Sequence, residues 1–129
     1  ERHYGIFERL TYAEVKVKHA VEYARFAARD PEFDLVSGES LRNFSTRSIS
    51  IISRLAKQHQ GRHILVFTHG GVLDILYRAA TRLDLQAPRT WQLTNTAVNR
   101  LLWTPQGLSL VGWGDTSHLE ALGKDETTA

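Results

Sequence analysis

The stretch Ile64–Leu73 constrains the fold more than any other part of the sequence. An apolar run leads to Thr68 and His69, two glycines follow, and an apolar pattern with helical spacing then resumes. A short apolar run that ends in glycines and continues as a helical pattern is typical of a buried strand, a turn and a helix N-terminus. We therefore expect a strand over residues 63–68, His69 at its carboxyl end, and a helix over residues 71–82.

The turn after this expected strand is suited to binding an anion. In open parallel sheets, ligands bind beyond the carboxyl ends of the strands. Gly70 and Gly71 have no Cβ, so their N–H groups can approach a ligand closely, and the N-terminus of the following helix favours negative charge. His69 adds an imidazole. The motif predicts a phosphate site, but a strand, two glycines and a helix also occur as plain packing, and this stretch alone leaves both interpretations open.

The composition is that of an ordinary globular domain. Of 129 residues, 42% are hydrophobic and 23% charged, and 16 Lys and Arg against 14 Asp and Glu leave a formal charge of +2. The basic residues are scattered, which argues against a nucleic-acid partner, and no apolar run reaches membrane-span length. Because there is no cysteine, disulfides and thiolate chemistry are excluded and a cytoplasmic location is expected. His59, His63 and His118 are interpreted as structural or surface residues, and no metal site is expected.

Two more helices and a hairpin are expected on either side of this stretch. Thr11 and Glu14 have capping-box spacing and start a helix that ends before Pro31. A second helix opens at Gly38-Glu39-Ser40 and stops at Gly61; its core-facing positions are Leu41, Phe44, Ser48, Ile51, Ile52 and Leu55.

The carboxyl-terminal part predicts strands over residues 97–104 and 108–113, joined by a short turn into an antiparallel hairpin. Helix, helix, strand, helix and hairpin is the order of an α/β domain whose sheet is mixed at one edge. The chain starts at Glu1, has no methionine, and offers its one parallel strand no neighbour. We expect the carboxyl-terminal part of a longer protein, with one domain over residues 1–120 and a flexible tail over residues 121–129.

Two motifs carry a resemblance to a known family. Glu1-Arg2-His3-Tyr4-Gly5 and Thr68-His69-Gly70-Gly71 flank Gly38-Glu39-Ser40 and Arg47. In this order and spacing they resemble the histidine phosphatase superfamily, also called the phosphoglycerate mutase-like family, over nearly the whole chain. The resemblance implies a three-layer α/β sandwich in which helices flank a mostly parallel central sheet, here in an amino-terminally incomplete version.

The same resemblance implies phosphoryl transfer from a small phosphorylated metabolite. Members of the family move the phosphoryl group to an active-site histidine, and water or a second hydroxyl then accepts it. By the resemblance, Glu1 protonates the leaving oxygen and later activates water, and His69 stabilises the phosphoryl charge with help from the Gly70 N–H. Arg2 and Tyr4 are implied substrate contacts. No metal or other cofactor is implied.

Three departures from the family pattern qualify this expectation. The Arg-His-Gly motif that carries the nucleophilic histidine does not occur in the sequence, so we expect the chain to be inactive alone. Arg9 stands where glycine is usual, which predicts an altered turn. Gly71 replaces the asparagine usual in mutases, and the segment between Gly5 and Gly38 lacks the long insertion of glycolytic mutases; both features favour a phosphatase. The alternatives are a phosphoglycerate mutase and a non-catalytic binding module of the same fold.

Several residues keep two interpretations. Arg2–Tyr4 fits a substrate contact or a solvated loop, Arg47 a brace between loops or a surface side chain, and Gly38–Ser40 mainly a helix start. An exposed sheet edge favours a homodimer. The tryptophans are expected in the core or an interface rather than in a platform for bases: Trp91, Trp103 and Trp113.

Overall fold

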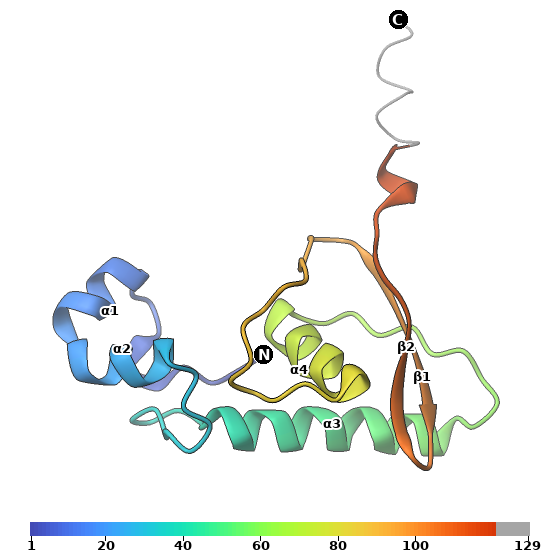
Figure 1. Cartoon of the computed structure of the whole chain (residues 1–129), viewed down its shortest axis with the longest axis horizontal. Coiled ribbons are helices and arrows are strands. Elements are labelled where there is room, and N and C mark those ends of the chain that lie inside the picture. The colour runs from blue at the N-terminus through green and yellow to red at the C-terminus, as the bar shows by residue number, and fades with distance from the viewer. Residues whose placement is uncertain (121–129) are drawn as a thin grey trace, which may run out of the picture.

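The computed structural model describes residues 1–120 as a small helical lobe, a pair of longer helices and a hairpin (Figure 1). The lobe holds α1 and α2, α3 runs beneath α4, and the hairpin stands at the opposite end from the lobe. No helix in this part of the chain is long and apolar enough to cross a membrane. The elements in chain order are the 3-10 helix η1 (Gly5–Phe7), α1 (Tyr12–Lys18), α2 (Ala20–Ala27), α3 (Leu41–Gln58), α4 (Gly70–Thr81), β1 (Val98–Thr104) and β2 (Gly107–Asp115).

Helices α1 and α2 replace the single helix that the sequence predicts before Pro31. The predicted capping box is present, because the Glu14 N–H donates to Thr11 Oγ1 over 3.3 Å and the Thr11 N–H donates to Glu14 Oε2 over 2.8 Å. The helix then breaks at His19, whose φ of −136° and ψ of 52° lie outside the helical region. The lobe has its own core of Phe7, Val15, Phe33 and Leu35.

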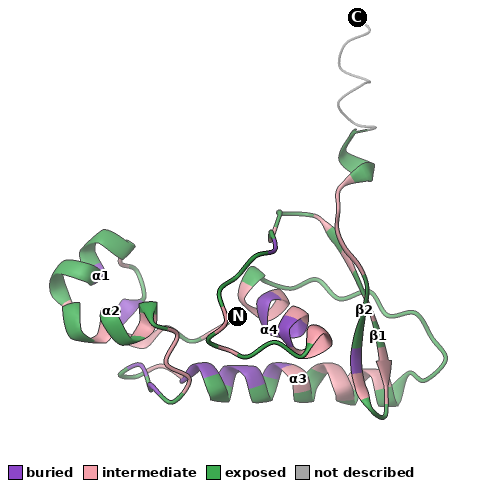
Figure 2. Ribbon diagram, in the orientation of Figure 1, coloured by how far each residue is buried: buried purple, intermediate pink, exposed green. Residues whose placement is uncertain are grey.

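Helix α3 begins as the sequence predicts, with the Ser40 side chain accepting a hydrogen bond from the Asn43 N–H over 3.1 Å. Leu41 and Phe44 pack against Ile75 of α4. Burial falls off along α3 toward its C-terminal end (Figure 2). For this reason the prediction that Ile51 faces the core is wrong: its side chain is exposed, because α3 extends past the elements that cover its first half.

The strand predicted over residues 63–68 is absent. The segment connects α3 to α4 without strand pairing and is exposed, to 77% at Leu65 and 90% at Phe67. A strand is stabilised by hydrogen bonds to a neighbouring strand, and within residues 1–120 the only strands are β1 and β2, which pair with each other. The structure is therefore α/β as predicted, but the mostly parallel central sheet is not seen in the described part of the chain.

The predicted hairpin is confirmed. Strands β1 and β2 are antiparallel, with Trp103 opposite Leu108 next to the turn. The hairpin packs on α4 through aromatic rings: Tyr77 stacks on the buried Trp91 at 4.0 Å between ring centroids and meets Trp113 edge-on at 4.9 Å. Core placement is therefore confirmed for Trp91. The predicted tail over residues 121–129 lies outside the described residues.

Replacing the Ser40 cap tests how much α3 depends on its first turn. Ser40→Ala should lower the free energy of unfolding by about 1 kcal/mol, because one N–H of the first turn loses its acceptor. Urea unfolding followed by circular dichroism measures this change. Ser50→Ala on the exposed face of the same helix is the matched control and should be neutral or slightly stabilising. Equal effects of both substitutions would contradict the capping role.

Candidate functional site

The amino-terminal motif lies tightly against the loop that precedes α3. Gly5 has a φ of +51°, and a Cβ at this residue would lie 2.1 Å from the Val36 carbonyl oxygen. A Cβ on Gly38 would lie 2.8 Å from the His3 carbonyl oxygen. That oxygen accepts a hydrogen bond from the Glu39 N–H over 3.1 Å. The two glycines therefore allow a backbone-to-backbone contact that no larger residue permits.

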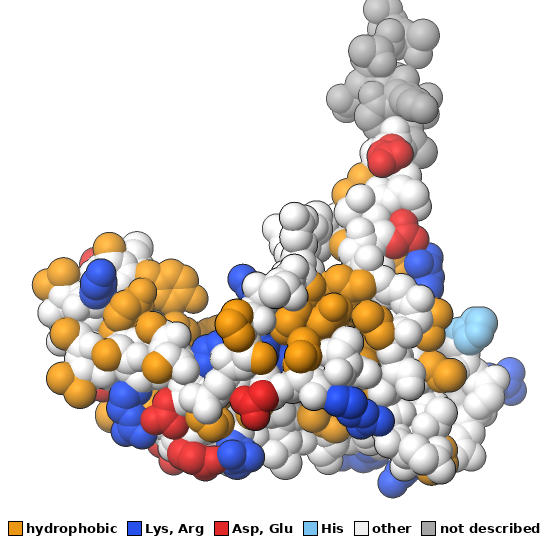
Figure 3. All heavy atoms as spheres, viewed as in Figure 1, with side chains coloured by type: hydrophobic (Ala, Val, Ile, Leu, Met, Phe, Trp, Pro, Cys, Tyr) orange, Lys and Arg blue, Asp and Glu red, His pale blue; other side chains and the backbone are white. Residues whose placement is uncertain are grey.

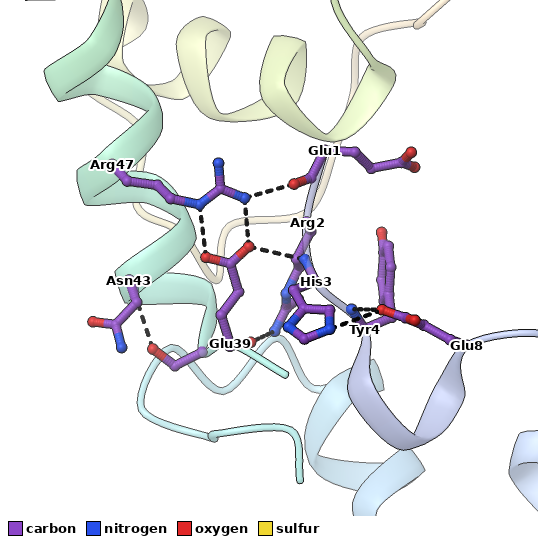
Figure 4. Close-up of polar contacts among 9 residues, drawn as sticks. Glu1, Arg2, His3, Tyr4, Glu8, Glu39, Asn43 and Arg47 are labelled. Atoms are coloured by element: carbon purple, nitrogen blue, oxygen red, sulfur yellow. Dashed lines mark hydrogen bonds and ion pairs between the residues drawn. The ribbon is translucent and has the colours of Figure 1, made fainter. Parts of the chain in front are cut away.

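Glu39 and Arg47 fix the position of this motif (Figure 4). The Glu39 carboxylate accepts hydrogen bonds from Arg47 Nε at 2.9 Å, from Arg47 Nη2 at 2.6 Å and from the His3 N–H at 2.9 Å. Arg47 Nη2 also donates to the Glu1 carbonyl oxygen at 2.5 Å, and Arg2 Nη2 donates to the Glu39 carbonyl oxygen at 3.1 Å. The Arg47 guanidinium lowers the pKa of Glu39, and the carboxylate in turn raises the pKa of Arg47. Arg47 is thus a brace between loops, and Glu39 does more than start a helix.

The structure brings Glu1 and His69 together across 68 positions of sequence. His69 Nδ1 lies 3.4 Å from Glu1 Oε2, and both side chains are more than half exposed. An imidazole and a carboxyl group at this distance are within reach of one small ligand, whether the imidazole is neutral or charged. His69 is therefore not a buried core histidine. The catalytic roles of the two residues stay predictions.

His69 also forms the N-cap of α4, and its side chain accepts no hydrogen bond from the helix. The first N–H groups of an α-helix have no intrahelical acceptor, and the helix dipole adds positive potential at that end. Gly70 leaves these N–H groups accessible, since a Cβ there would meet only Leu93 Cδ1 at 3.7 Å. Gly71 packs on the Phe44 ring, which lies 3.4 Å from the position of a Cβ.

A cavity of about 400 Å³ lies between the α1–α2 lobe and the N-terminus of α4. All three residues predicted to contact the substrate or its phosphate line it, namely Arg2, Tyr4 and Gly70. Glu1 lies instead on an adjoining, more open hollow that shares Arg2 and Tyr4 with the cavity. Figure 3 shows Lys and Arg side chains in the hollow between the lobe and the rest of the molecule. The charged and polar residues around the cavity are Arg2, Tyr4, Tyr12, Arg29, Asp30, Asp74 and Arg89.

Burial sets the chemical state of the two predicted contacts in the cavity. It raises the pKa of Tyr4, so the phenol stays protonated near neutral pH and can donate a hydrogen bond. Burial also lowers the pKa of Arg2, but the guanidinium starts so far above neutral that it stays charged. Its central carbon lies 5.5 Å from the Phe26 ring centroid, a cation–π arrangement. Arg2 and Tyr4 thus place a cation and a hydrogen-bond donor at the cavity; their role as substrate contacts stays a prediction.

Two residues in or near the amino-terminal motif, His3 and Arg9, have structural explanations that do not involve the cavity. His3 turns to Glu8, with 3.2 Å between its Nε2 and Glu8 Oε1, which favours the solvated-loop interpretation for its side chain. Arg9 has a φ of 63°, a left-handed conformation that glycine adopts freely. The turn is therefore kept with arginine, at a backbone strain of roughly 1–2 kcal/mol, which explains why glycine suits this position.

Sequence reasoning missed a buried ion-pair network at the floor of the cavity. Arg29 Nη2 donates to Asp74 Oδ2 over 2.8 Å, and Arg78 Nε donates to the same oxygen over 3.0 Å. Asp74 and Arg78 are both buried, while Arg29 reaches them from the end of α2. The only sequence signal is the spacing of Asp74 and Arg78, four residues apart on an otherwise apolar helix. Within residues 1–120, no three His, Asp or Glu side chains are grouped so as to hold a metal ion.

The sequence of this chain is similar to those of known proteins. The sequence profile described as "Histidine phosphatase superfamily (branch 1)" matches residues 1–116. A metal-independent phosphoserine phosphatase of Arabidopsis thaliana is 32% identical over 124 residues, which cover 95% of this chain and 50% of the relative. Phosphoglycerate mutase-like protein 4 of the same plant is 34% identical over 125 residues, covering 95% of this chain and 53% of the relative.

The chain thus spans about half the length of the curated relatives it matches. A solved structure, Bacillus stearothermophilus YhfR, superposes with a TM-score of 0.80 at 24% identity, over 92% of this chain and 59% of that chain. At this identity the superposition shows that the fold is shared and nothing further.

Neutralising Glu39 tests how the motif is held. Glu39→Gln should lower the free energy of unfolding at neutral pH by about 1.5 kcal/mol, because the hydrogen bonds from Arg47 and His3 lose their charged acceptor. The folded-state pKa of Glu39 is lowered, so its contribution is complete above the ordinary glutamate pKa of about 4.3 and is lost as the pH falls through the folded value.

The stabilities of parent and variant, measured by urea unfolding between neutral and acidic pH, should therefore converge below about pH 4. Glu32→Gln, at an exposed ion pair with Arg42, is the control and should change little at any pH. A Glu39→Gln deficit that stays constant down to acidic pH would contradict the assignment.

Proposed function

Because the chain belongs to the histidine phosphatase superfamily, we propose that it forms part of a phosphomonoester hydrolase that acts on a small phosphorylated metabolite through a phosphohistidine intermediate. The observation that carries the proposal is the 3.4 Å approach of His69 Nδ1 to Glu1 Oε2 beside the uncapped N-terminus of α4. A phosphoryl group in transfer carries negative charge on its outer oxygens and needs cations and N–H donors around it. The site offers His69, Arg2 and the first N–H groups of α4.

In the proposed reaction, a histidine nitrogen attacks phosphorus as the ester P–O bond breaks, and the Glu1 carboxyl group gives its proton to the departing oxygen. Water then attacks the phosphohistidine, Glu1 takes a proton from it, the P–N bond breaks and inorganic phosphate leaves. His69 donates to a phosphoryl oxygen in both steps. Since Arg-His-Gly does not occur in this sequence, the attacking histidine in this proposal comes from outside residues 1–129, and this chain alone is inactive.

Two sequence features favour hydrolysis over the mutase alternative. Gly71 follows the His69-Gly70 pair where the mutase pattern has asparagine, and the segment from Gly5 to Gly38 is short. In the structure that segment folds into the compact α1–α2 lobe. Activation by a bisphosphorylated sugar acid would instead support a mutase.

Removal of the His69 imidazole tests the proposed site. In the protein expressed from its whole gene, His69→Ala should lower the turnover of p-nitrophenyl phosphate by at least about a hundredfold, because one charge-stabilising donor is lost. His59→Ala, at the exposed end of α3, is the matched control and should retain full turnover. If His69→Ala keeps parental turnover, this site is not the catalytic one.

A mass measurement combined with a phosphatase assay tests the non-catalytic alternative. An intact mass of the whole-gene product near 14.6 kDa, together with no phosphate release from any ester, would favour a binding module that shares the fold.

The role of Glu1 can be separated from that of His69 through the leaving group. As a general acid, Glu1 matters most for alkoxide leaving groups, because p-nitrophenolate departs without a proton. Glu1→Gln should therefore lower kcat/KM for an alkyl phosphate by about a hundredfold or more and lower it much less for p-nitrophenyl phosphate. Since kcat/KM reports the first phosphoryl transfer, later hydrolysis does not mask the difference. Equal losses on both substrates would overturn the general-acid role.

A further inference from the structure

The face of the lobe that borders the cavity carries three aromatic side chains. Tyr4, Tyr12 and Phe26 all line the cavity of about 400 Å³, and we call them the aromatic wall. Phe26 lies at its centre: the Tyr12 ring stacks on it at 6.2 Å between ring centroids, and the Tyr4 ring meets it edge-on at 6.2 Å. The central carbon of the Arg2 guanidinium lies 5.5 Å from the Phe26 ring centroid. The wall is therefore a contiguous set of rings with one cation beside it.

Tyr12 is the member of the aromatic wall that lies outside the lobe's own core. Tyr4 and Phe26 are half-buried and pack against that core, whereas Tyr12 is 64% exposed and does not belong to the cluster. Its ring lies against Phe26 on one side, so the rest of the ring is open to a ligand. A tyrosine has only two side-chain torsions, and holding its ring against a ligand therefore costs little conformational entropy.

The aromatic wall continues from the cavity to the side of Glu1. Tyr4 and Tyr12 line both the cavity and the adjoining hollow, and Glu1 lies on that hollow. In the proposed reaction the Glu1 carboxyl group protonates the oxygen of the leaving alcohol, so the rest of that alcohol extends from Glu1 into one of these two spaces. Because Tyr12 lines both, the alcohol part of the substrate can reach its ring in either direction.

We propose that the aromatic wall stacks on an aromatic ring in the alcohol part of the substrate, so that the preferred substrates are phosphate esters of alcohols that carry such a ring. This inference rests on the proposed function, with Glu1 at the leaving oxygen. Aromatic rings attract one another in stacked and edge-on arrangements by more than the burial of their area. Tyr12 is then a specificity-determining residue. A cavity of about 400 Å³ is of the size that holds a small ligand, and such pockets are typically lined by aromatic side chains with a few polar groups.

Three phosphate esters of primary alcohols test the proposal, namely 2-phenylethyl, 2-cyclohexylethyl and ethyl phosphate. Each leaving group is a primary alkoxide that needs a proton, so differences in kcat/KM report contacts beyond the leaving oxygen. With the protein expressed from its whole gene, we expect kcat/KM for 2-phenylethyl phosphate to exceed that for ethyl phosphate by about tenfold or more. It should exceed that for 2-cyclohexylethyl phosphate by about threefold or more, because the saturated ring buries a similar area but has no π-face.

Substitution of Tyr12 assigns this preference to the aromatic wall. Tyr12→Ala should lower kcat/KM for 2-phenylethyl phosphate by about tenfold more than it lowers kcat/KM for ethyl phosphate, and Tyr12→Phe should keep the parental ratio because the ring is retained. Val17→Ala is the matched control, at an exposed residue of the same helix that lines neither the cavity nor the hollow, and should leave the ratio unchanged.

Two results would overturn the role of Tyr12: equal constants for the three esters in the parent protein, or a Tyr12→Ala variant that loses the same factor on all three. A kcat/KM for 2-cyclohexylethyl phosphate as high as that for 2-phenylethyl phosphate would overturn stacking in favour of apolar contact alone.

The proposed function fails separately. Absence of phosphate release from every ester would overturn hydrolysis. The same ratios would then be measured as Kd by calorimetry, and equal Kd values for 2-phenylethyl phosphate and ethyl phosphate would overturn the aromatic wall as a binding surface.

Discussion

The buried carboxylate of Asp74 is the interaction on which the arrangement of the cavity depends. One of its oxygens receives Arg29 from the lobe and Arg78 from its own helix, and the same two arginines hold the loop that follows α4. Three segments that share no strand or continuous helix are thus oriented by one charge. Removing one partner of a buried ion pair typically costs 3–5 kcal/mol, because the other charge is left uncompensated. The lobe is consequently joined to α4 and its following loop through charge, whereas α3 and α4 share an apolar cluster of Leu41, Phe44 and Ile75.

A second, more exposed set of contacts positions the amino-terminal motif. Gly5 and Gly38 let two loops approach until their backbones touch, and Glu39 then bonds to both the motif and Arg47. The glycines and the carboxylate have different roles. Close packing of backbones sets where the amino-terminal motif lies, and the carboxylate sets its orientation. Glu1 itself is left free of side-chain partners in the described chain except His69, so its carboxyl group remains available to a ligand.

The sequence predicted the features that depend on neighbouring residues, and it missed those that depend on contacts between residues far apart in the chain. The capping box at Thr11, the cap at Ser40 and the hairpin turn are local features, and all three are present. The strand over residues 63–68 was predicted from its apolar run, but pairing is decided by a neighbour far away in sequence, and residues 1–120 contain none. Arg29 and Arg89 reach the cavity only through tertiary contacts, so no local sequence pattern predicts that they lie there. The closeness of Glu1 and His69 followed from a family resemblance, because nothing in their local sequence implies it.

The exposed segment before His69 has a consequence for the strength of the proposed anion site. Residues 63–68 make no backbone hydrogen bond within the described chain, so the backbone of His69 is held from the side of α4 alone. A neighbour that pairs with this segment would order the backbone on the other side of His69 and thereby strengthen binding of a phosphate. Coupling of this kind is reciprocal. An anion bound at His69 would then favour the pairing of residues 63–68 by the same free energy, so that occupancy of the proposed anion site and ordering of this segment would be two readouts of one equilibrium.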